Sequence, residues 1–258
     1  MIIKGKTSRI RPALLGAAVL VACAFILHSP AHCAEWRVKP LRMDLAESAK
    51  TGVVTVINDS EERLTAEVRA LEWVQDAEGK DSYRETADLI FYPKALTIGG
   101  HEERIIRAGV KNAGAEREKT YRLFIKEIPH RDTAGGAKVA IAVQFGIPVF
   151  VAPRDPQPRG EIADAAAVNG TATFVVRNGG NVHFSIRTAT IRGMDPEGRE
   201  VFTESREGWY LLSGAARRYE VALPGAVCRR ISRLSIEVAA DALTVTKDLD
   251  FSPGQCGP

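Results

Sequence analysis

The sequence predicts an all-β protein built from two immunoglobulin-like β-sandwich domains. Short runs in which apolar and polar residues alternate recur about every 8 to 15 residues, which is typical of strands with one buried face. Sequences rich in Gly, Asn and Asp separate these runs, at residues 76–81, 98–100, 169–171, 178–181 and 195–200. No segment of useful length between them has the period of a helix.

A proline-rich segment divides the strand runs into two groups. Residues 151–160 read VAPRDPQPRG, and proline cannot donate the hydrogen bonds that a central strand needs. We therefore expect a hinge here, between a first domain at 35–154 and a second domain at 155–258. Each domain is long enough for the roughly seven strands of an immunoglobulin-like sandwich.

The first strand of the first domain changes phase. Its apolar residues fall on even numbers up to Val38 and on odd numbers from Leu41 onward. A phase change at a proline, here Pro40, predicts a bend, as when an edge strand passes from one sheet to the other. Arg42 would then point away from the core side of Leu41. The strands expected in this domain are 36–45, 52–58, 64–74, 88–92, 103–108, 120–128 and 138–151.

The second domain is expected to hold a similar set of strands. They are 171–178, 181–191, 200–203, 209–212, 217–223, 231–238 and 243–251. We find no convincing sequence repeat between the two domains.

The last run of the first domain alternates over a long stretch. From Val139 to Val151 every odd position is branched or aromatic, whereas the even positions begin with Ala140 and Ala142. The even face is too small to fill a core well. The odd face is therefore either buried in its own domain or offered to a partner, and the periodicity is consistent with both.

Residues 1–34 have the pattern of a secretory signal peptide, cleaved near Ala34. Four basic residues precede an apolar run at 13–27, which is shorter than the roughly 20 residues that span a bilayer. Removing this leader changes the formal net charge from +3 to −1, so the basic pI gives no reason to expect nucleic acid as a partner. We expect an exported chain that is not embedded in the membrane.

Cys228 and Cys256 are the only cysteines after the leader. In an oxidising compartment we expect them to form a structural disulfide, which would contribute roughly 3–4 kcal/mol on a loop-entropy argument. Two free thiols or a redox pair are the alternatives, and no C-x-x-C motif favours the redox pair.

Catalytic motifs are not evident. His101 to Glu103 begins like a zinc-protease motif, but Ile105 stands where the second histidine is needed and the segment follows a Gly-Gly turn. The sequence contains neither a G-x-S-x-G elbow nor a glycine-rich phosphate loop. We therefore expect no enzyme, no cofactor and no metal site.

Five segments in order carry a family resemblance: WRVKPLRMDL, GVVTVIND, YPKALTIGGHEERIIR, TYRLFIKEIP and IPVFVAP. Together they make the chain resemble the periplasmic chaperones of chaperone–usher pilus assembly, over essentially all of the mature sequence. The ending PVFVAP and the first strand look most like the branch that serves spore-coat-U-type pili. The resemblance implies a boomerang arrangement of two sandwiches, pilin subunits as partners and delivery to an outer-membrane usher.

The resemblance also implies a donor strand. In that family the last strand of the first domain is added to a pilin whose own sandwich lacks a strand. The positions that match the donor side chains are Val139, Ile141, Val143 and Phe145.

The same family holds the terminal carboxylate of the subunit with two basic residues. The first is an arginine of the first strand, which matches Arg42. The second is a lysine of the donor strand, but Pro148 stands at that position here. Lys126 is our candidate for its replacement, with Arg131 and Lys138 as alternatives. The arginine that usually precedes the linker proline is also missing, and Ala152 takes its place.

Two other classes of function remain as alternatives to a chaperone. An exported structural or adhesive sandwich protein, such as a pilus subunit, should be a single incomplete sandwich with an N-terminal extension, whereas this sequence predicts two sandwiches. An exported hydrolase would need a catalytic cluster, which the sequence does not suggest.

Overall fold

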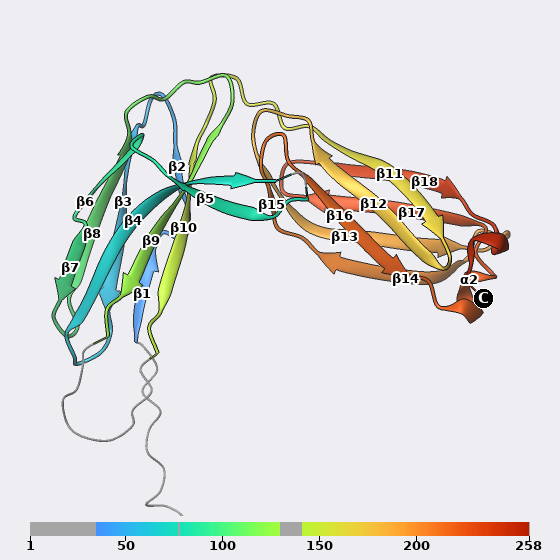
Figure 1. Ribbon diagram of the computed structural model, residues 1–258, viewed down its shortest axis with the longest axis horizontal. Coiled ribbons are helices and arrows are strands. Elements are labelled where there is room, and N and C mark those ends of the chain that lie inside the picture. The colour runs from blue at the N-terminus through green and yellow to red at the C-terminus, as the bar shows by residue number, and fades with distance from the viewer. Residues whose placement is uncertain (1–34, 77, 130–140, 258) are drawn as a thin grey trace, which may run out of the picture. The chain divides into compact units, whose positions relative to one another are not determined.

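The alternating sequences form strands almost throughout the computed structural model, which describes residues 35–76, 78–129 and 141–257. The described residues from Trp36 onward form one compact unit. Figure 1 shows the described chain as a succession of sheets, and the structure confirms the all-β class with two sandwiches. The expected signal peptide and residues 138–140 of the expected donor strand lie outside the described residues.

The first sandwich consists of two sheets whose strands lie between Trp36 and Val151. One sheet has the order β1 (Trp36–Lys39), β3 (Thr51–Asn58), β8 (Glu103–Val110), β6 (Leu89–Tyr92). The other has the order β2 (Met43–Leu45), β10 (Gln144–Val151), β9 (Lys119–Glu127), β4 (Leu64–Gln75), β5 (Asp81–Glu85), and β7 (Ala95–Ile98) also pairs with β4.

The phase change at Pro40 is the point at which the chain passes between the two sheets. β1 pairs with β3 in one sheet, and β2 pairs with β10 in the other. The peptide bond between Lys39 and Pro40 is cis. One detail of the prediction is wrong: Leu41 is 69% exposed and does not face the core, because it lies in the crossing segment before β2 begins.

Three further predictions for the first sandwich need correction. β5 was not expected, because its residues are almost all exposed and show no apolar face. β7 was not expected either, because it is a strand of only four residues, which pairs with the beginning of β4 from Leu64 to Glu67. The strand expected at 138–151 is β10, which begins only at Gln144, so the described residues 141–143 are not part of it.

The second sandwich lies between Gly160 and Asp250. One sheet has the order β11 (Gly160–Val168), β12 (Thr171–Asn178), β16 (Ala216–Ala222); the other has β14 (Glu200–Glu207), β13 (Phe184–Met194), β17 (Arg233–Ala240), β18 (Thr244–Asp250), with β15 (Tyr210–Leu211) paired to β13. β11 was not expected, because it is rich in alanine and its pairing with β12 shifts between Ala163 and Ala166. The Asn169-Gly170 turn has positive φ at both residues, as its sequence suggests.

Two short helical turns and a disulfide complete the second sandwich. The turns are α2 (Gly225–Cys228) and η1 (Pro253–Gln255), and the disulfide joins Cys228 to Cys256 as expected. Cys228 is fully buried in the core of this sandwich, so the bond ties the end of the chain to it. None of the helices in the described ranges is long and apolar enough to cross a membrane.

Candidate functional site

The edge of β10 is only partly covered. On one side β10 pairs with β9 along its whole length, from Gln144 to Val151. On the other side it pairs with β2 only from Val149 to Val151. Among the described residues, no strand pairs with this second side between Gln144 and Pro148, which we call the open edge. An open edge is a template for adding another strand.

The ladder with β9 decides which backbone groups face the open edge. The Glu127 N–H donates to the Val143 carbonyl, and hydrogen-bonded pairs alternate along an antiparallel ladder. Odd residues of β10 therefore bond to β9, and even residues face the open edge. The Ala152 N–H, which donates to the Leu45 carbonyl, follows the same rule. Gln144 and Gly146 thus present N–H groups to the open edge, whereas Pro148 has none.

The odd side chains divide along the strand. Ile147, Val149 and Val151 are buried in the core of the first sandwich. Val143 and Phe145 are only partly buried against that core, and Ile141 is 79% exposed. Phe145 packs edge-to-face on Trp36 with 4.6 Å between ring centroids, and the expected donor residue Val139 lies outside the described residues. The odd face of this run is therefore buried in its own sandwich from Ile147 onward and is accessible at Ile141, Val143 and Phe145.

Gly146 lets an aromatic side chain of β9 lie over the face of β10. It pairs in register with Phe124, and a Cβ at this glycine would lie 3.0 Å from the Phe124 ring. Phe124 packs edge-to-face on Tyr83, with 5.2 Å between centroids. The Phe124 ring therefore occupies the space that a side chain at position 146 would fill.

Arg42 lies immediately before β2, on the face of the sheet opposite to the core. Its Nε and Nη2 are both 2.8 Å from Oδ1 of Asp44, and its guanidinium lies 4.8 Å from the centroid of Phe150. Burial opposes the charged form, but the hydrogen bond and the charge of Asp44 outweigh it and raise the pKa of Arg42. A guanidinium is always charged in proteins. Because the Arg42 side chain is 38% exposed, this positive charge can be reached from solvent.

Arg122 is a second arginine on the same face, and the sequence analysis did not single it out. It lies on β9 and is 7% exposed. Its guanidinium lies 4.0 Å from the Trp73 ring centroid and 5.7 Å from that of Trp209, and Nη1 donates to the Gly146 carbonyl at 2.8 Å. Nε of Arg122 and Nε1 of Trp73 are both buried and have no hydrogen-bond partner among the described residues.

Lys126, the expected second anchor, lies further along β9. It pairs with Gln144 at the start of β10 and is exposed. It lines a pocket of about 230 Å³ together with Glu67, Arg69, Leu71, Tyr83, Phe124 and Gln144. Glu67 of this pocket also pairs in register with Lys126 across β4 and β9. The other candidates, Arg131 and Lys138, lie outside the described residues.

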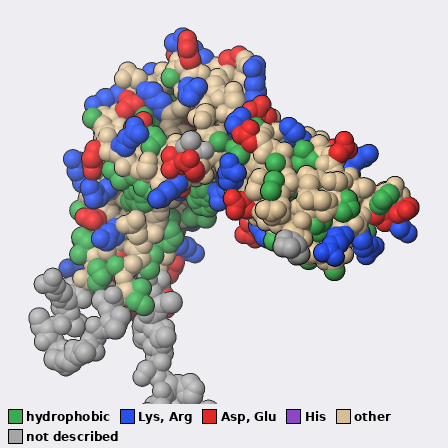
Figure 2. Space-filling model, turned by 45° about the vertical axis from the view of Figure 1, so that its right-hand side comes forward, with side chains coloured by type: hydrophobic (Ala, Val, Ile, Leu, Met, Phe, Trp, Pro, Cys, Tyr) green, Lys and Arg blue, Asp and Glu red, His purple; other side chains and the backbone are tan. Residues whose placement is uncertain are grey.

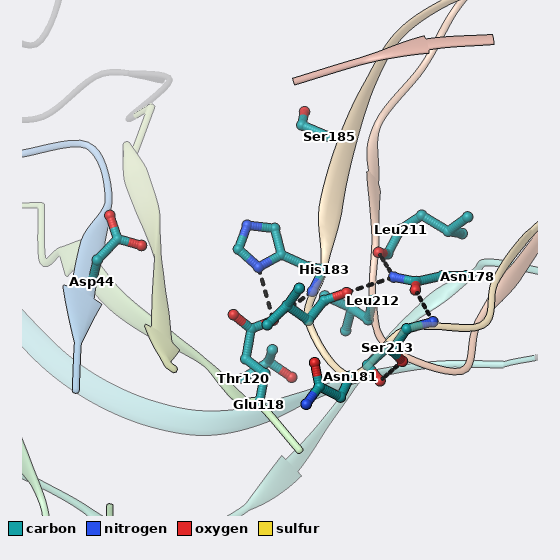
Figure 3. A network of polar contacts seen from close by, with 12 residues as sticks. Asp44, Glu118, Thr120, Asn178, Asn181, His183, Ser185, Leu211, Leu212 and Ser213 are labelled. Atoms are coloured by element: carbon teal, nitrogen blue, oxygen red, sulfur yellow. Dashed lines mark hydrogen bonds and ion pairs between the residues drawn. The ribbon is translucent and has the colours of Figure 1, made fainter. Parts of the chain in front are cut away.

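Polar contacts connect the first sandwich to the second (Figure 3). Glu118, just before β9, accepts the backbone N–H of His183 at 2.8 Å and lies 2.7 Å from Nδ1 of the same residue. Both side chains are buried, and the His183 ring stacks on Phe150 at 3.6 Å. Asn181 donates to the carbonyls of Glu116 and Asp155. These contacts form part of the polar link between the two sandwiches, together with the hydrogen bonds of Gln75 to the backbone of Tyr210 and Leu212.

Acidic and basic side chains are mixed over the surface of the molecule that Figure 2 shows. Figure 2 shows Lys and Arg interspersed with Asp and Glu on the visible face, with hydrophobic side chains gathered over the first sandwich. Of the residues that the structure describes, no three His, Cys, Asp or Glu side chains form a group that could hold a metal ion. The open edge and the two arginines are therefore the features that the site offers.

Comparison with known proteins gives one family match. Residues 36–157 match the model of the N-terminal domain of pili and flagellar-assembly chaperones, the PapD N-terminal domain. No curated protein matches the sequence.

Solved structures share the fold at low sequence identity. One is a complex of the chaperone CsuC with the tip adhesion subunit CsuE from archaic chaperone-usher Csu pili of Acinetobacter baumannii, with 17% identity, 83% of this chain and 97% of that chain covered, and a TM-score of 0.56. Another is the Salmonella enterica SafA pilin in complex with the SafB chaperone, with 10% identity, 86% and 100% covered, and a TM-score of 0.53. A third is a chaperone–tip adhesin complex of CFA/I fimbriae biogenesis, with 11% identity, 83% and 98% covered, and a TM-score of 0.55.

Proposed function

Because the chain carries an N-terminal domain of the pili and flagellar-assembly chaperone family, we propose that it is a pilus-assembly chaperone that adds β10 to a pilin subunit. The open edge of β10 carries this proposal, since it combines unpaired backbone groups with apolar side chains that are not fully buried. The family consists of assembly factors, so the expectation that the chain is not an enzyme is confirmed.

The proposed contact is an added strand along Gln144–Pro148 and the residues before it. The even residues supply backbone hydrogen bonds, and Ile141, Val143 and Phe145 enter the groove of the pilin, with Val139 as a fourth side chain. Fully burying one such side chain contributes about 1.5–3 kcal/mol. Val143 and Phe145 are already partly buried, so the apolar gain is several kcal/mol before the cost of ordering.

Arg42 is the proposed anchor for the carboxylate of the bound subunit. β2 begins at Met43 opposite Val149, so a strand that follows the open edge must end beside Pro148. Arg42 directly precedes β2 and therefore lies at the end of such a strand. Its positive charge favours a strand that ends there with a carboxylate over one that ends with an amine. Its planar guanidinium can also donate two parallel hydrogen bonds to a carboxylate.

The cellular setting follows from the same proposal. We propose that residues 1–34 export the chain to the periplasm, where it binds pilins and passes them to an outer-membrane usher. The expected hinge between 35–154 and 155–258 is consistent with strands that end at Val151 and resume at Gly160. The similarity to a structure from archaic chaperone-usher pili supports the assignment to the spore-coat-U-type branch.

The test is capture of a pilin. The chain is coexpressed with each pilin encoded beside its gene, and the soluble 1:1 complex is purified and its Kd measured. Arg42→Ala should weaken binding by about 2–5 kcal/mol, because the subunit carboxylate loses its partner. The melting temperature of the free chain should hardly change, because a partly exposed ion pair contributes about 0–1 kcal/mol.

Two results would contradict the proposal. Equal affinity of the native chain and Arg42→Ala would remove the anchor. If none of the pilins encoded beside the gene were captured, the chain would be better explained as a structural or adhesive sandwich protein.

A further inference from the structure

We infer that Asp44 is an internal competitor for Arg42, which a subunit carboxylate has to displace or share the arginine with when it binds. This inference rests on the proposed chaperone function and concerns the control of affinity at the same site. Asp44 then sets how tightly a subunit is held, and the contacts of its two carboxylate oxygens are the observation that carries the inference.

The first step is that Arg42 already holds a carboxylate in the free chain. Nε of Arg42 lies 2.8 Å from Oδ1 of Asp44 and 3.0 Å from Oδ2, and Nη2 lies 2.8 Å from Oδ1. These contacts use the edge of the guanidinium that Nε and Nη2 form, which is one of the edges that bind a carboxylate through two hydrogen bonds. A subunit carboxylate therefore finds this edge of Arg42 occupied.

The second step is that the contact is built into the beginning of β2. Asp44 is the second residue of β2 and pairs in register with Phe150 of β10. Side chains two residues apart along a strand share a face, so Asp44 lies on the same side as Arg42. The guanidinium of Arg42 lies over the Phe150 ring, 4.8 Å from its centroid. The ring supports Arg42 from one side, and Asp44 holds it in the plane of its own carboxylate.

The third step is the charge around Arg42. Burial opposes its charged form, but the hydrogen bond and charge of Asp44, with a further contribution from the charge of Asp241, outweigh this effect and raise the pKa of Arg42. A positive charge that already has acidic neighbours attracts a further carboxylate less strongly, because the like charges repel one another. Asp44 therefore lowers the affinity of this anchor for a subunit carboxylate.

The fourth step is that the pair can open. The side chains of Arg42 and Asp44 are 38% and 61% exposed, so both can be reached from solvent. An ion pair with this exposure is weak, and water can solvate the carboxylate that leaves it. Asp44 thus weakens the hold on a subunit without preventing it, which suits an assembly factor that later releases its subunit.

The experiment uses one pilin encoded beside the gene in two forms, with its native C-terminal carboxylate and with a C-terminal amide. Kd is measured for the native chain, for Asp44→Asn and for the matched control Glu85→Gln. Asparagine keeps the size of the aspartate and removes its charge. Glu85 forms a similarly exposed pair with Arg69, but it lies on β5 at the other edge of the sheet from β2. Glu85→Gln therefore removes the same charge at a distance from Arg42.

Asp44→Asn should bind the carboxylate form about three- to tenfold more tightly than the native chain, the range expected when a weak competing ion pair is removed. It should bind the amide form within about twofold of the native chain, because the amide does not compete for a carboxylate site. In the Arg42→Ala background the change Asp44→Asn should alter the Kd by less than about twofold, since both residues act through one contact. Glu85→Gln should bind both forms like the native chain.

Several results would overturn the inference. Weaker binding of the carboxylate form by Asp44→Asn would show that Asp44 orients Arg42 for the subunit and does not compete with it. An unchanged Kd would show that Asp44 has no influence on the anchor. An equal gain for both forms of the pilin, or the same gain in Glu85→Gln, would show only a general repulsion between the pilin and the chain.

These results are distinguishable from a failure of the chaperone proposal. Each of them leaves capture of the pilin by the native chain, and its weakening in Arg42→Ala, intact. If the chaperone proposal is wrong, neither form of the pilin binds the native chain. The melting temperature of free Asp44→Asn should stay close to that of the native chain, because an exposed ion pair contributes little to stability. A change in Kd then reports on the site and not on the fold.

Discussion

Asp88 is a single side chain that links the two sheets of the first sandwich. Its Oδ2 accepts hydrogen bonds from Nζ of Lys119 at 2.8 Å and from the hydroxyl of Tyr121 at 2.6 Å. Asp88 directly precedes β6, whereas both donors lie on β9 in the opposite sheet. Burial disfavours the charged carboxylate, but the bonds from Lys119 and Tyr121 outweigh it and lower the pKa of Asp88.

The lowered pKa of Asp88 predicts a loss of stability in acid. A carboxyl whose pKa is lower in the folded chain stabilises it above the unfolded pKa of about 3.9, and this contribution is lost as the pH falls through the folded value. Asp88→Asn should lower the free energy of unfolding at pH 7 by about 1–3 kcal/mol. Denaturant unfolding from pH 7 to pH 2 should show the two chains converging below about pH 4. A difference that stays constant over this range would contradict the assignment.

The sequence predicts the orientation of some single residues correctly and that of others wrongly. Met43 and Leu45 are buried and Arg42 lies on the opposite face, as the alternation indicates. Leu41 does not follow the pattern, because it belongs to the crossing between sheets. Arg122 was not singled out, because in the sequence it resembles any outward-facing strand residue and its pairing with Pro148 is visible only in the structure. That pairing depends on the register between segments about 25 residues apart and cannot be read locally.

At the scale of elements, the alternating run that leads into β10 and continues along it has two parts with different surroundings. Ile141→Asp should leave the melting temperature of the free chain nearly unchanged, because this side chain is exposed, but should abolish pilin capture by placing a charge in an apolar groove. Ile147→Asp is the matched control, since Ile147 has the same parity and is buried. It should destabilise the free chain by several kcal/mol. Thermal melts and capture assays test both variants.

A larger loss of stability for Ile141→Asp than for Ile147→Asp would contradict this division of the run. A large fall in melting temperature for Ile141→Asp would place Ile141 in the chain's own core. Undiminished capture by a folded Ile141→Asp variant would remove it from the donor set.

Strands with a clear apolar face were predictable, and those without one were not. The long runs of β4, β9 and β12 appear in the structure within a few residues of their expected bounds. β5 and β11 were missed because exposed polar residues and alanines give no alternation. The division of β10 was also beyond the sequence pattern, because it depends on where β2 begins beside it.

At the scale of the whole molecule, the second sandwich packs on the face that carries the two arginines. Phe150 and Trp73 of the first sandwich join the core cluster that contains Phe184 and Leu211 of the second. The buried pair of Glu118 and His183 adds a polar link beside them. The proposed anchor therefore lies where both sandwiches contribute to the surroundings, while the open edge belongs to the first sandwich alone.

Hydrogen exchange of the β10 amides is the most direct test of strand addition. In the free chain the N–H groups of Gln144 and Gly146 face the open edge and should exchange quickly, whereas those of Phe145 and Ile147 bond to β9 and should be protected. Binding of a pilin should slow exchange at Gln144 and Gly146 by at least about tenfold and leave Phe145 and Ile147 little changed. A stable complex in which Gln144 and Gly146 exchange as fast as in the free chain would contradict the account.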